Sequence, residues 1–233
     1  IRESSHRIHN PLDPRALAQL GEALRLAPGA SVLDLACGSG ELLCTWARDH
    51  GIVGLGGDIE PAFVAKARAR ASELGVTDRV TFEVADAAGY AANEPVDVAA
   101  CVGASWIGGG LDGTIDLLEA NLKPTGLLLV GEVFWRSGPP QDALDALGVN
   151  ADDFLSLPGL MQRLLVDHDV VEMVLATPDS WDRYACAQWF NLRSFLDAPP
   201  DDDLADTIRA ELRSAPLTLV TWQRELLGWG LFA

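Results

Sequence analysis

The sequence predicts an α/β protein with a mostly parallel sheet and helices on both faces, and three observations support this fold class. Short apolar runs alternate with helical segments along the chain, which is typical of parallel strands joined by helices. One apolar run ends in a tight glycine turn, Gly38-Ser39-Gly40, that leads into a helix. The 233 residues, 48% of them hydrophobic, are enough to bury one large core.

Apolar periodicity and the glycine and proline boundaries place the elements of the first half of the chain. Helices are predicted over residues 14–26, 41–50, 61–74 and 111–122. Strands are predicted over residues 32–35, 53–57, 80–84, 96–102 and 127–134. Asp13 is the expected N-cap of the first helix, and Gly75 ends the third.

After Gly138-Pro139-Pro140 the pattern changes to shorter helices and a weaker strand. Helices are predicted over residues 141–147, 158–167 and 180–196, and an alternating strand over 170–176. The acidic run Asp201-Asp202-Asp203 introduces a further helix that is expected to end before Pro216. A helical or mixed segment over 218–226 and a last strand over 227–233 complete the chain.

The glycine turn indicates a nucleoside site. Glycine lets a ligand approach the main chain closely, and the following helix N-terminus offers free N–H groups. Asp58 lies 20 residues after Gly38, at the end of the next strand, where a carboxylate can accept hydrogen bonds from ribose hydroxyls. Leu43 occupies the region where a dinucleotide site prefers a third small residue, and the chain has no Walker-type phosphate loop. A nucleoside without phosphate, such as S-adenosylmethionine, therefore fits best.

The segment Asp34-Leu35-Ala36-Cys37-Gly38-Ser39-Gly40 resembles motif I of the class I S-adenosylmethionine-dependent methyltransferases. Asp58-Ile59 and residues 82–87, 96–101 and 122–130 resemble further segments of this family in the same order, so that the resemblance covers residues 31–134. The flanks resemble a bacterial subgroup of unassigned small-molecule methyltransferases.

This resemblance implies a Rossmann-like sheet of seven strands with an antiparallel last strand and a helical lid insertion. It also implies a single methyltransferase domain over residues 1–233. Its expected parts are an N-terminal cap (1–28), a cofactor-binding core (29–135), a substrate and lid region with the sixth strand (136–215), and a final helix and strand (216–233).

The resemblance further implies S-adenosylmethionine as cofactor and S-adenosylhomocysteine as product. Asp58 is expected at the ribose hydroxyls, Asp86 at the adenine amino group with the Ala87 N–H beside it, and Asp34 at the glycine turn or the cofactor's amino group. The expected cofactor-binding residues are Asp34, Ala36, Cys37, Gly38, Gly40, Asp58, Ile59, Asp86, Ala87 and Gly103. For Asp34 and Asp86 the alternative is an exposed carboxylate in an Asx turn.

The implied reaction is methyl transfer to a small-molecule acceptor by direct displacement, in which the protein mainly aligns the reactants. The catalytic candidates are His9, Glu132 and Tyr184, with His9 on an N-terminal segment that folds over the cofactor. The substrate-binding candidates are Ser105, Trp106, Trp135 and Trp181, although packing onto the sheet is an alternative for the aromatic residues. His6 and His9 alone make a weak metal site, so no metal is expected. The acceptor atom stays open.

The composition excludes some partners. The formal net charge of −17, from 34 acidic and 17 basic residues, repels phosphate backbones and anionic lipid head groups. Neither nucleic acid nor a membrane is therefore an expected partner. The apolar runs are shorter than a membrane span and no secretory leader is visible, so a cytoplasmic location is expected.

Three alternatives remain open at this point. The four cysteines have no metal-binding or Cys-x-x-Cys spacing and are expected as buried thiols, but Cys37 and Cys101 would follow neighbouring strands, where thiol-assisted chemistry is conceivable. A nicotinamide-dependent oxidoreductase is the second alternative, against which Leu43 argues. The third is a protein that binds S-adenosylmethionine without turnover.

Overall fold

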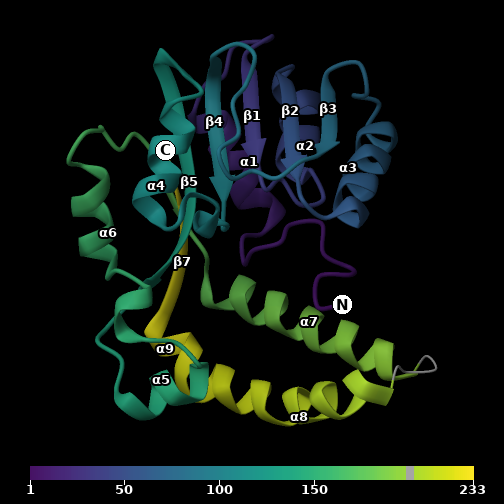
Figure 1. The fold of residues 1–233 in the computed structure, drawn as a ribbon, viewed down its shortest axis with the longest axis vertical. Helices are drawn as coiled ribbons and strands as arrows, with labels where there is room; N and C mark the ends of the chain where they lie inside the picture. Colours follow the sequence, from purple (N-terminus) through teal and green to yellow (C-terminus); the bar gives the residue numbers. More distant parts are fainter. Residues whose placement is uncertain (198–201) are drawn as a thin grey trace. The chain divides into compact units, whose positions relative to one another are not determined.

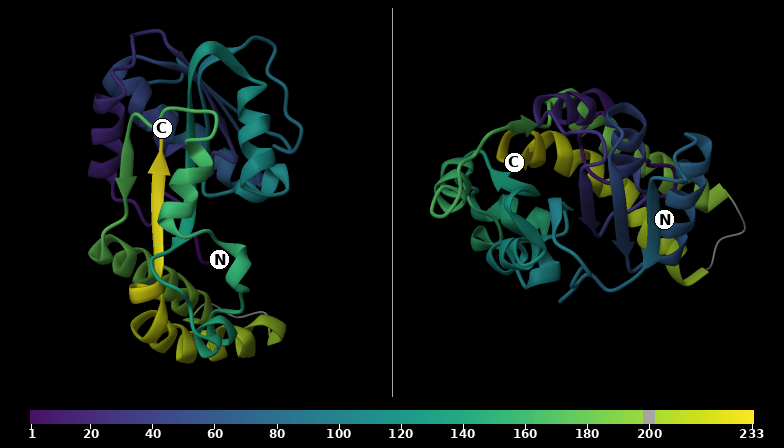
Figure 2. Two further views of the ribbon diagram at one scale, coloured as in Figure 1. Left: turned by 90° about the vertical axis from the view of Figure 1, so that its left-hand side faces the viewer. Right: turned by 90° about the horizontal axis from the view of Figure 1, so that it is seen from above.

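The computed structural model describes residues 1–197 and 202–233, and these residues form one seven-stranded sheet surrounded by helices (Figure 1). The strand order is β3-β2-β1-β4-β5-β7-β6. β1 to β5 pair in parallel, whereas the last strand, β7, is antiparallel (Figure 2). The strands are β1 (Ser31–Leu35), β2 (Val53–Asp58), β3 (Val80–Val84), β4 (Val96–Val102), β5 (Leu122–Trp135), β6 (Met173–Leu175) and β7 (Leu227–Phe232). The predicted Rossmann-like fold class is confirmed.

The helices follow the expected order. They are α1 (Pro14–Ala23), α2 (Glu41–His50), α3 (Pro61–Glu73), α4 (Leu111–Glu119), α5 (Gln141–Leu147), α6 (Leu157–Leu164), α7 (Pro178–Asp197), α8 (Asp202–Thr218) and α9 (Arg224–Leu226). Short 3-10 turns, η1 (Ser105–Gly108) and η2 (Ala151–Asp153), and a π-helical turn, η3 (Leu219–Gln223), add to them. The bounds of α2, β3, β4 and α5 coincide with the prediction, whereas β5 begins earlier and β6 is shorter than expected.

The prediction that a helix ends before Pro216 is wrong, because α8 continues through this proline to Thr218. Proline removes one backbone hydrogen bond and lowers helix stability, but tertiary packing can override such a local preference. Leu219, just beyond the helix, is buried, and the chain continues there as the π-helical turn η3. Asp201, at the predicted start of this helix, lies outside the described residues.

The strand order places the site. β2 and β3 extend the sheet on one side of β1, whereas β4 and β5 extend it on the other, so that the connections diverge between β1 and β4. Leu35, the last residue of β1, lies level with Gly57 of β2 and Cys101 of β4. In open α/β sheets ligands bind outside the carboxyl ends of the strands at such a divergence. The residues after Leu35 and Cys101 therefore occupy the expected binding edge.

The contacts divide the described chain into two compact units. The sheet unit contains Arg7–Glu132, Val170–Val174 and Gly230–Ala233, and the helical unit contains Ile1–His6, Val133–Asp169 and Leu175–Trp229. Trp46 is fully buried in the sheet unit, where its indole N–H donates to the carbonyl of Leu17. Trp135 belongs to a buried cluster of the helical unit. Within the described ranges, no helix combines the length and the apolar character that a bilayer crossing requires.

Candidate functional site

The turn after β1 has no side chain at Gly38 and Gly40, so a ligand can approach its main chain closely. Its backbone is left-handed at Ala36, Gly38 and Gly40, with φ angles of 58°, 54° and 71°. A left-handed alanine stores strain of the kind that clusters at ligand sites. A Cβ atom at Gly40 would come within 2.7 Å of the Ala67 Cβ and the Phe82 ring, so a larger residue would displace the packing below the turn. Glycine at this position therefore lets the turn pack closely against Ala67 of α3 and Phe82 of β3.

Asp58 ties the end of β2 to this turn. One carboxylate oxygen accepts a hydrogen bond from the Gly38 N–H at 2.8 Å, and the other accepts from the Glu60 N–H at 2.9 Å. The side chain is 7% exposed. Each carboxylate oxygen has two lone pairs, so both can accept a further hydrogen bond. The predicted ribose acceptor thus also fixes the shape of the glycine turn.

Asp34 is a buried carboxyl with an unused oxygen. The residue is 3% exposed, and its Oδ1 atom has no hydrogen-bond partner in the structure. Burial, with a smaller contribution from the charge of Asp58, raises the pKa of Asp34 to about 8. A buried polar atom without a partner is costly, which makes it a strong candidate for a ligand contact. Asp34 is therefore suited to receive a cationic or hydrogen-bond-donating group.

A pocket in the sheet unit adjoins both the glycine turn and Asp34. It contains about 490 Å³ of empty space, including the part that opens to solvent. Residues 7–10 of the N-terminal segment form one side, and the turn forms another. The lining residues are Arg7, Ile8, His9, Asn10, Leu12, Leu17, Asp34, Ala36, Cys37, Gly38, Ser39, Glu41, Leu42, Val102 and Leu231.

His9 lies against the glycine turn. Its Nε2 atom is 3.0 Å from the Ser39 hydroxyl, and its ring meets the edge of Phe63 at the start of α3, with 4.3 Å between ring centroids. A Cβ atom at Gly38 would come within 2.8 Å of the His9 Nδ1 atom. Close approach of the imidazole thus depends on the missing side chain at Gly38. The structure brings this predicted catalytic residue to the pocket.

A charge network borders the same pocket. Arg70 donates to both carboxylate oxygens of Glu41 at 2.8 Å, and it also lies 2.9 Å from Glu73. Arg7 donates to Glu73 at 3.0 and 3.4 Å. The guanidinium groups of Arg7 and Arg70 hold the pKa of Glu73 below its usual range. Glu41 is buried with its charge compensated by Arg70.

Other predicted cofactor residues lie at the strand ends of the sheet unit but do not line this pocket. Asp86 is exposed after β3, and its Oδ1 atom accepts from the Ala88 N–H at 2.9 Å, as in an Asx turn. Ala87 is buried beside it, whereas Ile59 after β2 is 70% exposed. Gly103 after β4 has a left-handed φ of 86°. The binding edge is therefore open where a nucleoside base is expected.

The candidates after β4 and within β5 differ in exposure. Ser105 begins η1, and its carbonyl accepts from the Thr114 hydroxyl at 2.5 Å, which fixes this turn on α4. Trp106 is 73% exposed. Glu132 is half-buried in β5. Trp106 is thus a large apolar side chain exposed after β4.

Tyr184 belongs to a polar cluster of the helical unit. Its hydroxyl donates to a carboxylate oxygen of Glu3 at 2.8 Å, and Gln188 donates to the same oxygen at 2.6 Å. The ring of His6 meets the Tyr184 ring edge-on at 4.8 Å. Burial, followed by the charge of Glu3, raises the pKa of Tyr184 far above its usual value. The phenol therefore stays protonated at neutral pH.

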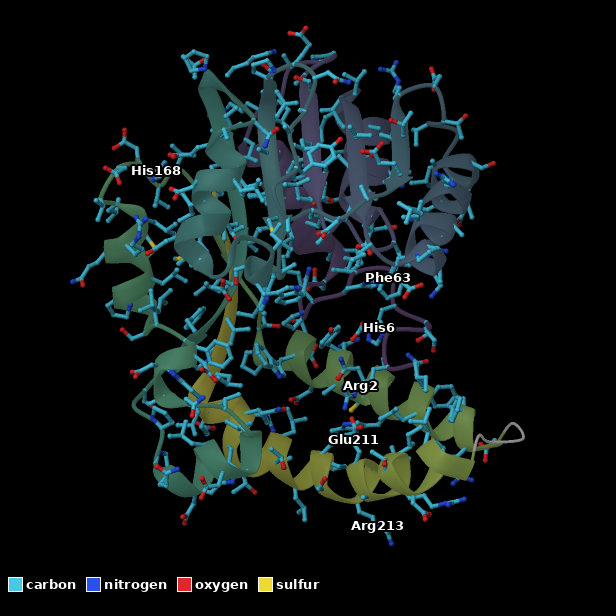
Figure 3. All side chains as sticks on the ribbon, viewed as in Figure 1. Arg2, His6, Phe63, His168, Glu211 and Arg213 are labelled. Carbon is cyan, nitrogen blue, oxygen red and sulfur yellow. The ribbon has the colours of Figure 1, made fainter. Side chains whose placement is uncertain are left out.

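The first residues of the chain are fixed on the same unit by further polar contacts. Arg2 donates to both carboxylate oxygens of Glu211 in α8, at 2.6 and 2.8 Å (Figure 3). Asn191 of α7 donates to the backbone carbonyl of Arg2 at 2.7 Å. These bonds hold the residues that immediately precede the pocket segment.

The two remaining tryptophan candidates take part in packing of the helical unit. The Trp135 indole N–H donates to the carbonyl of Ala151 at 2.9 Å, and its ring meets Phe154 edge-on. Trp181 packs partly buried against the same cluster. Both rings thus stabilise this unit in the structure.

The four cysteines are free thiols, but the prediction that all of them are buried is wrong for Cys186, which is exposed. Burial, with a smaller contribution from Asp34, raises the pKa of Cys101 to about 12, and burial also raises that of Cys37. A thiolate is the reactive form, so these values disfavour thiol chemistry at both positions. In the part of the chain that the structure describes, no group of three acidic, histidine or cysteine residues could hold a metal.

Sequence reasoning missed several residues of the pocket. Arg7, Asn10, Ser39 and Glu41 line it without having been assigned a role. Ser39 and Glu41 could have been inferred, because they sit within and directly after the glycine turn. Arg7 and Asn10 carry no local signal, since they reach the pocket only through folding of the N-terminal segment.

Comparisons with known proteins agree with this geometry. A family model described as a methyltransferase domain matches residues 32–126. Protein YjhP of Escherichia coli (strain K12) is 54% identical over the whole chain and 95% of its own length. S-adenosylmethionine-dependent methyltransferases crystallised with S-adenosyl-L-homocysteine are also similar. The Geobacter sulfurreducens protein is 54% identical with a TM-score of 0.96, covering 100% of this chain and 94% of that one. The Thiobacillus denitrificans protein is 55% identical with a TM-score of 0.95, covering 99% and 94%.

These relatives support S-adenosylmethionine as the cofactor over the nicotinamide alternative. They match the chain over nearly its full length and share its fold. The chain therefore belongs to the family of S-adenosylmethionine-dependent methyltransferases.

Proposed function

We propose that this chain transfers the methyl group of S-adenosylmethionine to a small-molecule acceptor by direct displacement. The observation that carries the proposal is the bare glycine turn, fixed by Asp58, beside a pocket into which Asp34 offers an unpartnered carboxyl oxygen. When bound, the cofactor supplies a methyl group already activated by its sulfonium. The protein's contribution is then mainly alignment and exclusion of water.

The pocket fits the amino-acid tail of the cofactor, and the open strand ends fit its nucleoside. Asp34 accepts a hydrogen bond from the tail's ammonium group in this proposal. Asp58 accepts from the ribose hydroxyls with the lone pairs that the two backbone N–H groups leave unused. Asp86, exposed at the end of β3, is accessible to the adenine amino group, with the Ala87 N–H beside it. Ile59 offers an exposed apolar side chain to the base.

On the acceptor side we assign roles by position and protonation. His9 adjoins the pocket and is the candidate base for an acceptor that must lose a proton. Glu132 is the alternative base within the sheet unit. Tyr184 is excluded from a base role by its raised pKa, and its hydroxyl donates to Glu3 within the helical unit. Ser105 and the exposed Trp106 are the proposed contacts to the acceptor.

The charge of the chain supports a small acceptor over a nucleic acid. A net charge of −17 repels a phosphate backbone at long range. This repulsion does not act on a neutral molecule, and a cationic one is attracted, so this class of acceptor is favoured. The proposed activity falls in EC class 2.1.1, which contains the methyltransferases.

Two experiments test this proposal. Thermal unfolding is measured with S-adenosylmethionine, S-adenosylhomocysteine or NADH, and only the first two are expected to raise the melting temperature, because a ligand that binds the folded state stabilises it. Formation of S-adenosylhomocysteine is then followed with a panel of primary amines, thiols, phenols and carboxylates.

Stabilisation by NADH alone would contradict the proposal at the level of the cofactor. Stabilisation by the methyl donor without product from any acceptor class would support binding without turnover instead. The Ala36-to-Gly40 turn would then be a ligand site of a non-catalytic protein.

A further inference from the structure

A buried imidazole in the helical unit faces two hydrogen-bond acceptors. The side chain of His6 is 8% exposed, and its Nε2 atom lies 3.3 Å from the backbone carbonyl oxygen of Tyr184. Its Nδ1 atom lies 3.3 Å from Oε2 of Glu3, and neither of these two atoms has a hydrogen-bond partner among the residues that the structure describes. A carbonyl oxygen and an ionised carboxylate can only accept. Both ring nitrogens therefore lie next to an acceptor.

These surroundings match the protonated form of the ring. A neutral imidazole has one N–H group, so one of its nitrogens turns a lone pair towards an acceptor, whereas an imidazolium donates from both nitrogens. Burial by itself disfavours the charged form, so the carboxylate of Glu3 has to compensate the charge of His6. Histidine is the side chain whose charge changes between about pH 5 and 8. The attraction within this pair is therefore present at the acidic end of that interval and is lost towards its alkaline end.

The neighbouring groups fix Glu3 and leave one of its oxygens for the imidazole. Oε1 of Glu3 accepts from the Tyr184 hydroxyl at 2.8 Å and from the Gln188 amide at 2.6 Å. Burial holds the pKa of the Tyr184 phenol far above its usual value, so this neighbour stays neutral. The guanidinium of Arg2 is bound to both carboxylate oxygens of Glu211 in α8 (Figure 3). The imidazole is thus the group whose protonation changes the charge next to Oε2.

The same contacts fasten the segment that leads to the pocket of the sheet unit. Residue 7 follows His6 directly, and residues 7–10 form one side of that pocket. Before this stretch the chain is held by Glu3 and His6, and within it His9 contacts Ser39. Loosening the contacts of Glu3 and His6 therefore gives the pocket-lining stretch more freedom to move.

We propose that residues 2–6 form a latch, with His6 as its proton-sensitive contact, which holds the N-terminal segment in place at low pH and loosens as the pH rises. The latch itself follows from contacts within the helical unit. Its effect on the pocket rests on the proposed function, which places the cofactor there. Residues 2–6 are not among those that line the pocket, so opening of the latch changes the rates of cofactor entry and release by the same factor and leaves the affinity nearly unchanged.

Hydrogen exchange measured by NMR tests the latch without any ligand. The amides of Ser4 and His6 donate to the carbonyls of Ile1 and Glu3, and their protection is compared at about pH 5.5 and 8 after division by the intrinsic exchange rates. Protection in the wild-type chain should fall about 10-fold, the lower end of the range for a hydrogen bond to a charged group. His6→Gln should be weakly protected at both pH values. The control His168→Gln changes a histidine of the same unit that contacts the carbonyl of Leu164, and it should behave like the wild type.

Glu3→Gln separates the charge of the latch from its packing. Glutamine has the same size and keeps an acceptor for the Tyr184 hydroxyl, but it has no charge to stabilise an imidazolium. In this background His6→Gln should change the protection little, so the effects of the two substitutions should not add. Thermal unfolding verifies that each variant is folded.

Stopped-flow release of S-adenosylhomocysteine, followed by tryptophan fluorescence, tests the effect on the pocket. Release from His6→Gln should be about 10-fold faster than from the wild type at about pH 5.5, and the two rates should be equal at about pH 8. Association rates should show the same ratios. Comparing the two chains at each pH removes the contribution of Asp34, which both contain.

The possible failures are distinguishable. Wild-type protection that does not depend on pH, or that changes equally in His6→Gln, would overturn the latch. A pH-dependent latch with equal release rates at every pH would overturn its effect on cofactor exchange and leave the proposed function intact. A wild-type chain that does not bind S-adenosylhomocysteine would refute the proposed function, while hydrogen exchange would still decide on the latch.

Discussion

Replacing Asp34 with asparagine tests the electrostatics of the pocket through the pH dependence of ligand binding. In the ligand-free protein, burial raises the pKa of Asp34 to about 8, so the carboxyl is mostly protonated at neutral pH. An ammonium group at the unpartnered oxygen favours the ionised form, which lowers this pKa in the complex. Binding of S-adenosylhomocysteine should therefore release a proton, and its affinity should rise with pH below about pH 8.

The size of the effect follows from the pKa. With a ligand-free value of about 8, roughly 1% of Asp34 is ionised at about pH 6 and roughly 9% at about pH 7. If the complex keeps Asp34 ionised throughout, the affinity rises about ninefold over this interval. Ionising the carboxyl at about pH 6 then costs about 2.7 kcal/mol, since each pKa unit corresponds to about 1.4 kcal/mol. About 0.9 proton is released per ligand bound at about pH 7.

Titration calorimetry in buffers with different ionisation enthalpies measures both the affinity and the number of protons released. Asparagine has no proton to lose, so Asp34→Asn should bind with much weaker pH dependence and release correspondingly fewer protons. S-adenosylhomocysteine is the appropriate ligand because it carries the amino-acid tail without the sulfonium charge. A wild-type affinity that stays flat between about pH 6 and 7, or an unchanged slope in Asp34→Asn, would refute the assignment of this carboxyl to the ammonium group.

Three further changes test other parts of the structure. Asp58→Ala should weaken S-adenosylhomocysteine binding by about 1 to 3 kcal/mol and also lower stability, since two backbone N–H groups lose their acceptor; calorimetry and urea unfolding measure the two losses. Gly228→Ala would bring a Cβ atom within 2.2 Å of the buried Phe134 ring, so it should lower the free energy of unfolding by about 1 to 3 kcal/mol or more. The control Gly138→Ala, whose Cβ would have no atom within 4 Å, should unfold like the wild type. Tyr184→Phe should lower turnover without adding or removing a limb of the pH–rate profile, because the phenol's pKa lies far above neutral; a shifted limb near neutral pH would contradict this.

Local patterns were sufficient for most elements of the sheet unit. The apolar run of β4 and the helical period of α2 are bounded by glycine, proline or polar residues, and both elements begin and end where the sequence predicts. Prediction was weaker where distant packing decides. α8 passes through Pro216 despite the proline's cost, and β5 begins at Leu122, where the sequence predicts the end of a helix.

The same contrast between local pattern and distant packing holds for the residues of the candidate site. The glycine turn and Asp58 belong to one β-α-β unit, so their spacing in the sequence is enough to bring them together. Arg7 and Asn10 lie far before the turn in the chain, and the His9 contact to Ser39 closes a gap of 30 residues. No periodicity or spacing specifies such a contact, because it depends on how the N-terminal segment folds back over the turn.

Asp34 and Asp86 show what the fold adds to residue type. Both are aspartates at strand ends, and the sequence offers the same two readings for each: a ligand contact or an exposed Asx turn. Asp86 is exposed, and one of its carboxylate oxygens accepts a hydrogen bond from the Ala88 N–H. Asp34 is buried, and its Oδ1 atom has no hydrogen-bond partner among the described residues. Burying a carboxyl without a partner destabilises the ligand-free protein, and only a ligand that supplies the missing donor offsets this cost. In the proposed function, the burial that opposes folding is what gives Asp34 its affinity for a cationic group, whereas Asp86 binds as a solvated side chain.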